Sequence, residues 1–326
     1  MSGADPPITQ WNPTPILDER LLGGEQYRFS LVILNQPIHN IPLFLDLWRR
    51  VRIAADGGAN WVHAIRADLP PTGPALDFIV GDLDSLRSET RTWFVEQPGL
   101  GSAGRQQQIV EIQDQDSTDF AKAVRHAREL SRKRAPGRLS AGSSNGQADD
   151  IICYSGLGGR VDQAMSQLHH LYMFQQRLQP SDATGNESAE AETRERPEDS
   201  GGYASGRMYL TNGESLTFVL LAGRHAIRIR DKLDIYEAAP IPTNIKAEEA
   251  SGSEDKPKVF GKHVGIIPLA GPSLLTTRGL EWDVLDWRTE FGGRMSTSNH
   301  TTPGSDVVEV QTSRDVLFTI DIPVLV

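Results

Sequence analysis

The stretch IVGDLDSL, residues 79–86, decides the fold and poses a chemical problem. An apolar run stops abruptly and is followed by two carboxylates, Asp82 and Asp84, two positions apart. A short apolar run of this kind is typical of a buried strand in a parallel sheet. Two like charges at its end are unfavourable unless a partner neutralises them. Since residues two apart in an extended chain point to the same side, we expect both carboxylates to face one cation.

The composition limits the class of protein. At 326 residues the chain exceeds the roughly 100 to 200 residues of a usual domain, which predicts two domains. Acidic residues outnumber basic ones, 43 to 33, which argues against a nucleic-acid-binding protein. The single cysteine, Cys153, excludes an internal disulfide and fits a buried strand thiol in a reducing compartment. No run reaches the ~18 apolar residues of a membrane span and the start resembles no targeting peptide, so we expect a cytoplasmic protein without membrane contact.

The first half of the chain alternates short apolar runs with helical patterns. Strands are predicted over residues 29–35, 51–56, 77–82, 108–113 and 151–156. The last two helical patterns each have one apolar face, formed by Phe120, Val124 and Ala127 in the first and by Val161, Met165, Leu168 and Tyr172 in the second. Continuously apolar strands separated by helices are the signature of a parallel sheet covered on both sides. The sequence therefore predicts a Rossmann-like α/β domain over residues 25–178.

The second half, after residue 206, has short strands and turn signals. Asn212-Gly213 between two apolar runs is a hairpin signal. Further strands are predicted over 224–229, 263–270, 281–287, 307–311 and 316–322. We therefore expect an all-β sandwich domain over residues 207–326, preceded by a linker over 179–206, with an N-terminal tail over 1–24.

Three segments have the composition of insertions: residues 131–150, 179–202 and 247–258. They are rich in Ser, Gly, Pro and charge, and they hold too few apolar residues to offset the entropy of ordering. We expect mobile loops there. The basic run Arg132-Lys133-Arg134 is interpreted as a solvated helix end rather than a targeting or nucleic-acid patch.

Unusual residues collect at the carboxyl ends of four predicted strands, where open parallel sheets bind their ligands. The segments are Asp56-Gly57-Gly58, Asp82 to Ser85, Asp114 to Asp119, and Gly156 to Gln163. Taken singly, each has the alternative explanation of a helix cap or a tight turn. Capping needs one carboxylate per helix, however, and a crowded oxygen-rich cluster suits Mg²⁺ bound to substrate phosphates. The chain has neither a P-loop nor a GxGxxG dinucleotide motif.

The motifs ADGGAN (55–60), GDLDS (81–85), DQDSTDF (114–120) and GLGGRVDQ (156–163) resemble, in this order, those of thiamine pyrophosphokinases. Downstream, GIIPLAGPSLLTTRGLEW (265–282) and MSTSN (295–299) resemble the thiamine-binding domain of that family. The resemblance implies transfer of the pyrophosphoryl group of ATP to thiamine, giving thiamine diphosphate and AMP, with Mg²⁺. It also implies a homodimer whose active sites lie between the catalytic domain of one subunit and the β domain of the other.

The resemblance further assigns roles to individual residues. The implied metal ligands are Asp56, Asp82, Asp84 and Asp119. The implied catalytic residues are Asp82, Asp84, Asp116, Asp119 and Arg160. The residues implied to bind ATP are Asp56, Gly57, Gln115, Thr118, Gly158 and Gly159. Arg160 would reach phosphate, while Asp162 and Gln163 would help to shape the cleft. Thiamine would lie against Trp282, Ser296, Ser298 and Asn299.

Several points stay open at this level. A tryptophan face attracts a cation such as thiamine, but either Trp282 or Trp287 can supply it. We expect in-line attack of the thiamine hydroxyl on the β-phosphorus, with a general base from the Asp114 to Asp119 segment that the sequence does not single out. The alternatives are a metal-dependent hydrolase of nucleotides or phosphate esters and a non-catalytic thiamine or nucleotide sensor.

Overall fold

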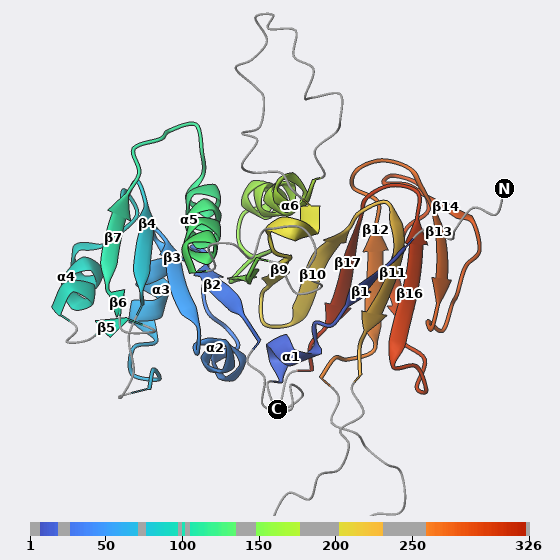
Figure 1. The fold of residues 1–326 in the computed structure, drawn as a ribbon, viewed down its shortest axis with the longest axis horizontal. Helices are drawn as coiled ribbons and strands as arrows, with labels where there is room; N and C mark the ends of the chain where they lie inside the picture. Colours follow the sequence, from blue (N-terminus) through green and yellow to red (C-terminus); the bar gives the residue numbers. More distant parts are fainter. Residues whose placement is uncertain are drawn as a thin grey trace, which may run out of the picture.

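The protein is described here by a computed structural model, which covers residues 7–18, 27–70, 76–96, 100–101, 105–134, 148–176, 202–230 and 259–323 (Figure 1). Of the three predicted insertions, residues 135–147, 179–201 and 247–258 lie outside the described residues. Within the described part of the chain, no helix is both long and apolar enough to cross a membrane.

The parallel half of the fold contains the strands predicted from the first half of the sequence. They are β2 (Phe29–Ile33), β3 (Val51–Ala55), β4 (Phe78–Gly81), β7 (Gln108–Glu111) and β8 (Asp150–Tyr154), joined by β9 (Met208–Thr211). Their order in the sheet is β9-β8-β2-β3-β4-β7, and every pair is parallel. The chain therefore runs outward from β2 to β7 and then returns to β8 on the other side of β2. A separate two-stranded ribbon pairs β5 (Leu100–Gly101) with β6 (Arg105–Gln106).

The antiparallel half continues the same sheet. Its strands are β10 (Ser215–Leu220), β17 (Val316–Asp321), β12 (His263–Ile267) and β15 (Ser296–His300), which follow β9 in this order and complete a ten-stranded sheet. The Asn212-Gly213 hairpin between β9 and β10 is confirmed, with Gly213 at φ 92°. Thus β9, from the predicted β domain, extends the parallel sheet of the predicted α/β domain. The proposed division at residues 179–206 stays a prediction, and the two halves share one sheet.

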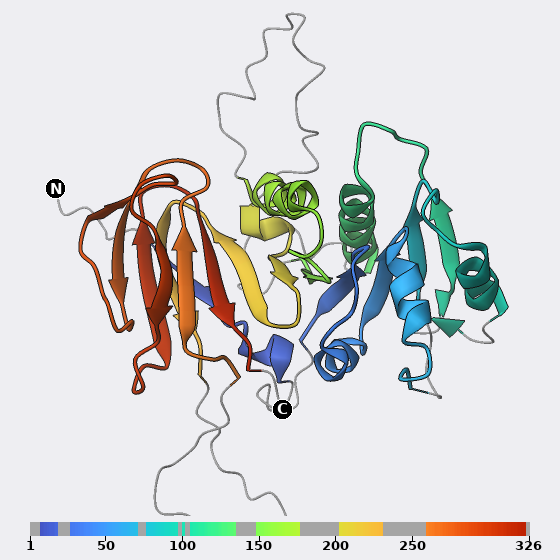
Figure 2. The ribbon, with the colours of Figure 1, turned by 180° about the vertical axis from the view of Figure 1, so that it is seen from behind.

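A second sheet of five strands packs on the antiparallel half to form a sandwich, seen at one end of the molecule in Figures 1 and 2. Its order is β1 (Ile8–Trp11), β11 (Gly223–Arg228), β16 (Val307–Thr312), β13 (Ser273–Arg278) and β14 (Trp287–Thr289). The segment predicted as an N-terminal tail thus supplies an edge strand, which is parallel to β11. Trp11 explains its attachment, because its ring is 1% exposed and its Nε1 donates to His225 Nδ1 at 3.1 Å.

Alternation along the strands divides the interior into two cores. One core joins Phe29, Leu31 and Ile33 of β2 to the helices α2 (Ile41–Leu47), α3 (Gly58–Ala64) and α4 (Ser88–Glu96) and to the sandwich interior. The other joins Val32 of β2 to α5 (Asp119–Arg134) and α6 (Val161–Gln175). The remaining short elements are α1 (Thr14–Leu17) and the 3-10 turn Gly202–Ser205. The predicted fold class, a parallel α/β half followed by a β-rich half, is confirmed.

Two local predictions are wrong in part. Of the face predicted for α6, Val161 is 77% exposed and Met165 is 50% exposed, whereas Leu168 and Tyr172 are partly buried against the core. The fully buried side of the helix includes Leu171 and Phe174 instead. The strand predicted over 281–287 is mostly a turn, and β14 begins only at Trp287. By contrast, the Phe120 face of α5 is buried as predicted, and Arg132 and Lys133 lie exposed near its end.

Candidate functional site

The topology brings three of the predicted aspartates to one edge of the sheet. Strands β3, β4 and β7 are neighbours and parallel, so the residues that follow their carboxyl ends meet. Asp56 follows β3, Asp82 follows β4, and Asp119 begins helix α5 after β7. The Asp82 backbone N–H lies 3.3 Å from Asp119 Oδ1, which joins two of these strand ends directly. The predicted convergence of carboxylates is therefore present.

The carboxylates of Asp56, Asp82 and Asp84 form a compact group, with one oxygen from each lying within 4.8 Å of the others. Asp56 is 1% exposed, and its Oδ2 accepts from the Ser85 backbone N–H at 2.9 Å. Its Oδ1 is buried and has no hydrogen-bond partner among the described residues. Burying a carboxylate oxygen without a hydrogen-bond donor costs free energy unless a bound cation neutralises it. The donor set is all oxygen, which is the chemistry that Mg²⁺ prefers, so the residues present fit the ion that the resemblance implies.

Asp82 and Asp84 meet through a turn rather than through strand alternation. Strand β4 ends at Gly81, and Leu83 between the two aspartates has φ 68°, outside the extended region. The Asp84 backbone N–H approaches Asp82 Oδ1 at 3.3 Å, as in a short Asx turn. The expectation that an extended chain aligns the two side chains is wrong, because the strand has already ended. The shared orientation that it predicted arises from the left-handed residue between them.

Gly81 makes the close approach of the carboxylates possible. A Cβ at this position would lie 2.7 Å from Asp56 Cβ and 2.9 Å from Asp119 Oδ1. Real Cβ atoms do not approach other atoms this closely, so a larger residue would push the two aspartates aside. Gly57, the predicted neighbour of the ATP phosphates, is similarly crowded, since a Cβ there would lie 2.4 Å from Asn35 Nδ2.

A buried lysine, absent from the sequence-based predictions, joins the cluster. Lys122 is 2% exposed, and its Nζ lies 3.2 Å from Asp82 Oδ2 and 3.2 Å from Asp119 Oδ1. The signal in the sequence was its position three residues after Asp119, which puts both on one side of a helix. The ammonium supplies one of the positive charges that the crowded carboxylates require.

The electrostatic environment shifts the pKa values of Asp56 and Asp82 in opposite directions. Burial is the main cause that raises the pKa of Asp56 to about 6, against the opposing hydrogen bond from Ser85. Burial also acts to raise the pKa of Asp82, but the hydrogen bonds from the Asp84 backbone and Lys122 outweigh it and hold this pKa below its usual value. Asp82 is thus ionised at neutral pH in the metal-free protein. Asp56 is the member whose charge a bound cation would most favour.

The N-terminus of α5 is capped by a single threonine rather than by a capping box. Thr118 Oγ1 accepts from the Ala121 backbone N–H at 3.1 Å, so Thr118 is the residue that caps α5. This leaves Asp119 for its contacts with Lys122 and the Asp82 backbone. Gln115 and Asp116 are exposed on the loop, and the Asp116 N–H donates to Asp114 Oδ1 at 3.0 Å.

The glycine loop follows β8, which β2 separates from β3 in the sheet. Gly158 and Gly159 precede α6, and Gly159 has φ 71°. Arg160, predicted to reach phosphate, forms an exposed ion pair with Asp162, with Nη2 to Oδ2 at 2.6 Å. Gln163 is exposed in the first turn of α6. The structure therefore holds Arg160 with its own neighbour, and its predicted role in binding phosphate stays a prediction.

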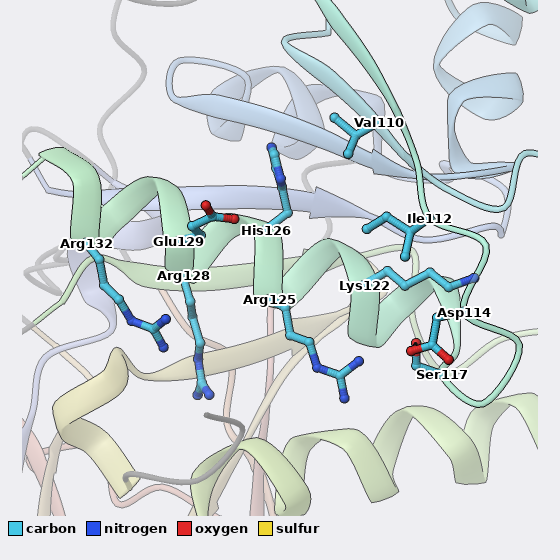
Figure 3. A pocket seen from close by; sticks show the side chains of 10 residues that line it. All are labelled: Val110, Ile112, Asp114, Ser117, Lys122, Arg125, His126, Arg128, Glu129 and Arg132. Atoms are coloured by element: carbon cyan, nitrogen blue, oxygen red, sulfur yellow. Dashed lines mark hydrogen bonds between the residues drawn. The ribbon is translucent and has the colours of Figure 1, made fainter. Parts of the chain in front are cut away.

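A cavity of about 470 Å³ lies behind the cluster, beside α5. Figure 3 shows Arg125, Arg128 and Arg132 projecting from the same side of the helix. Arg128 is committed to packing, since its Nη2 donates to the Phe174 backbone carbonyl at 2.7 Å and its guanidinium lies 4.9 Å from the centroid of that ring. The described residues that line this cavity come from β7, the loop after it and α5, and none of the three clustered carboxylates is among them, so we do not assign it to the substrates.

A smaller cavity, of about 310 Å³, lies in the sandwich. The four residues predicted to contact thiamine, Trp282, Ser296, Ser298 and Asn299, all line it, together with Trp287. Trp282 is 54% exposed, whereas Trp287 is partly buried against the core. A polar strand and two indole rings around one cavity suit a flat, cationic heteroaromatic ligand.

Sequence models of known families match both halves of the chain. "Thiamin pyrophosphokinase, catalytic domain" matches residues 44–180, and "Thiamin pyrophosphokinase, vitamin B1 binding domain" matches residues 244–317. The chain belongs to the thiamin pyrophosphokinase family. The first match contains the carboxylate cluster, and the second contains the tryptophan-lined cavity. The resemblance read from the motifs is confirmed, and the protein is an enzyme of this family.

Individual thiamin pyrophosphokinases agree with this assignment over most of their length. The chain is 28% identical over 308 residues to Thiamine pyrophosphokinase 2 of Arabidopsis thaliana, covering 90% of this chain and 86% of the relative. It is 28% identical over 323 residues to Thiamine pyrophosphokinase 3 of Oryza sativa subsp. japonica, covering 95% and 93%.

Solved structures show that the fold is shared as well. Thiamin pyrophosphokinase from Candida albicans superimposes with a TM-score of 0.65 at 21% identity, covering 98% of this chain and 95% of the other. The yeast enzyme gives a TM-score of 0.64 at 19% identity, covering 99% and 94%.

Proposed function

We propose that this protein transfers the pyrophosphoryl group of ATP to the hydroxyl of thiamine, releasing AMP and thiamine diphosphate. One observation carries the proposal: this chain has both the carboxylate cluster of Asp56, Asp82 and Asp84 and the cavity lined by two tryptophans. Binding alone would not require three converging carboxylates, and a general phosphohydrolase would not require a cavity for a cationic ring.

The carboxylate cluster is the proposed metal and phosphate site. Asp56, Asp82, Asp84 and Asp119 would hold Mg²⁺, which when bound neutralises the phosphate charge and supports phosphoryl-type transfer by positioning and electrostatics. Support comes from Asp56 Oδ1, which has no hydrogen-bond partner among the described residues, and from the all-oxygen donor set. Lys122 would keep Asp82 and Asp119 in place before substrate arrives.

The proton of the thiamine hydroxyl needs an acceptor near this cluster. In the loop before α5, Asp114 accepts bonds from the Asp116 backbone and the Ser117 hydroxyl, and Asp119 is occupied by Lys122. Asp116 carries an exposed carboxylate between them. We therefore propose Asp116 as the general base.

The two halves of the site are proposed to come from different subunits of a homodimer. In the ten-stranded sheet, β15 is at one edge, and seven inter-strand steps separate it from β3. At about 4.8 Å per step, this places the cavity roughly 30 Å from Asp56 within one chain. Figure 1 shows the same separation, with β4 and β7 at one end of the molecule and β13 and β14 at the other. Thiamine in one chain's cavity would therefore reach the carboxylates of a second copy.

We also propose that the protein works in the cytoplasm, where a reducing environment prevents the oxidation of thiols to disulfides. The buried Cys153 is compatible with this setting. A fluorescent fusion followed by microscopy in the native organism would test this location.

One assay tests the proposed reaction. The purified protein is incubated with ATP and Mg²⁺, with and without thiamine, and the nucleotide products are separated. AMP that forms only with thiamine supports the kinase. Phosphate release without thiamine would instead support a hydrolase, and thiamine binding without any turnover would support a sensor.

A further inference from the structure

The backbone of Trp282 is fixed by one buried side chain. The Trp282 N–H donates to Asn299 Oδ1 at 3.1 Å, and Asn299 Nδ2 donates to the Trp282 carbonyl at 2.9 Å. Asn299 is 7% exposed and belongs to β15. A single amide thus satisfies both backbone groups of a residue that lies in a turn rather than in a strand. Asn299, which is predicted to contact thiamine, therefore also holds the backbone of Trp282 in place.

The indole ring of Trp282 is supported by a second residue of β15. The imidazole of His300 packs against it, with ring centroids 5.2 Å apart and planes inclined at 43°. Trp282 lines the cavity, whereas His300 lies outside the set of described residues that line it. His300 therefore contacts the indole from beyond the cavity wall and leaves its cavity side available.

Glu281 holds His300 in this orientation. Its Oε2 lies 2.7 Å from His300 Nδ1, and its backbone N–H donates to the His300 carbonyl at 2.7 Å. Adjacent residues of the turn, Glu281 and Trp282, are thus tied to adjacent residues of β15 by side-chain and backbone contacts. The isolated bridge between Leu280 and Thr301 extends this pairing by one residue on each side.

We propose that His300, oriented by Glu281, is a positioning residue for thiamine, which fixes the Trp282 indole at the angle that the substrate ring meets. This inference rests on the proposed function. An exposed tryptophan in a turn would otherwise sample several rotamers and would lose that freedom on binding. Support from His300 removes part of this cost before substrate arrives. It also selects Trp282, rather than the more buried Trp287, as the ring that stacks on thiamine.

The test separates the ring of His300 from its hydrogen bond. In His300→Ala we expect the Kd and KM for thiamine to rise about three- to tenfold, the range of a lost aromatic pair. The KM for ATP should stay within about twofold, because His300 contacts the Trp282 indole and Glu281 and is not one of the clustered carboxylates. His300→Phe retains an aromatic ring and should recover most of the thiamine affinity. Glu281→Gln weakens the orienting bond and should give an intermediate value.

A matched control exists in the other half of the molecule. His63 packs on Trp93 with centroids 5.1 Å apart, so His63→Ala removes a comparable contact without touching the cavity. It should leave the Kd for thiamine unchanged. Wild-type thiamine affinity in His300→Ala, by calorimetric titration of a variant that retains its fold by circular dichroism, would overturn the inference. Equal losses in His300→Ala and His300→Phe would also overturn it. If the wild-type protein itself bound no thiamine, the proposed function would fail instead.

Discussion

Gly81 and Asp56 lie so close that a Cβ on the glycine would stand 2.7 Å from the Cβ of the aspartate. The contact joins the end of β4 to the end of β3 at the point where the carboxylates converge. The spacing of the proposed metal site therefore depends on the absence of a side chain.

Gly81→Ala should separate Asp56 from Asp119 and weaken Mg²⁺ binding by about tenfold or more, because metal ligands tolerate only small displacements. Isothermal titration with Mg²⁺, at a temperature where the variant is folded, measures the effect. Gly304→Ala is the control, since a Cβ there would meet no atom of the described residues within 4 Å. Unchanged Mg²⁺ affinity in Gly81→Ala would show that this packing does not set the site.

Asp82→Asn and Asp84→Asn should each lower kcat/KM by about 100-fold or more, because each removes a charge from the proposed metal site. Initial rates measured over a range of Mg²⁺ concentrations would report both turnover and metal dependence. Asp68→Asn changes an exposed aspartate outside the cluster and should have little effect. Wild-type rates and metal dependence in both site variants would make the metal-site proposal wrong.

Lys122→Met should leave Asp82 and Asp119 without their shared cation. We expect the free energy of unfolding in EDTA to fall by about 1 to 3 kcal/mol, the usual cost of orphaning a partly buried ion pair. Added Mg²⁺ should restore more stability in the variant than in the wild type, because a bound ion neutralises the same carboxylates.

Urea unfolding with and without Mg²⁺ measures this difference. Lys133→Met serves as the control, because Lys133 lies in the same helix but pairs with Glu129 at the surface, with the lysine side chain 69% exposed. The proposed role of Lys122 fails if Mg²⁺ stabilises the wild type and the Lys122 variant equally.

Asp56 should make the metal-free protein less stable as the pH rises. Its folded pKa of about 6 lies above the 3.8 of an unperturbed aspartate, chiefly through burial. A raised folded pKa gives a favourable contribution to stability below the unfolded pKa, and this contribution is lost as the pH rises through about 6. We therefore compare the free energies of unfolding of Asp56→Asn and of the wild type in EDTA. Between about pH 5 and about pH 7.5, this difference should shift in favour of the variant by on the order of 1 kcal/mol. Denaturant unfolding at both pH values decides the sign, and a relative loss would contradict the assignment.

The proposed homodimer predicts complementation between two defective chains. Asp82→Asn damages the cluster, and Trp282→Ala damages the cavity, so each alone should be nearly inactive at low thiamine. After co-refolding of equal amounts, mixed dimers should contain one site with both intact halves, giving about a quarter of wild-type activity. A site built within one chain would show no recovery. Light scattering of the wild type provides the independent measure of subunit number.

The sequence by itself determined the strands of the parallel half and the chemistry of the site. Apolar runs that are buried on both faces must lie inside a parallel sheet, and carboxylates placed after them must meet at its edge. Cys153 in β8 and the Asn212-Gly213 hairpin follow from equally local signals. The motifs around Asp82 and Trp282 were sufficient to identify the family.

Only the tertiary structure decided which groups contact one another. Lys122 joins Asp82 from a different element, and His300 supports Trp282 across a turn that the sequence presents as a strand. The buried side of α6 and the edge strand β1 were likewise set by distant partners. Periodicity reports which residues of one element share a face, but the neighbour that covers this face depends on long-range packing. The carboxylates illustrate the same point. The sequence shows how many of them follow the strands, but their spacing depends on the close packing around Gly81.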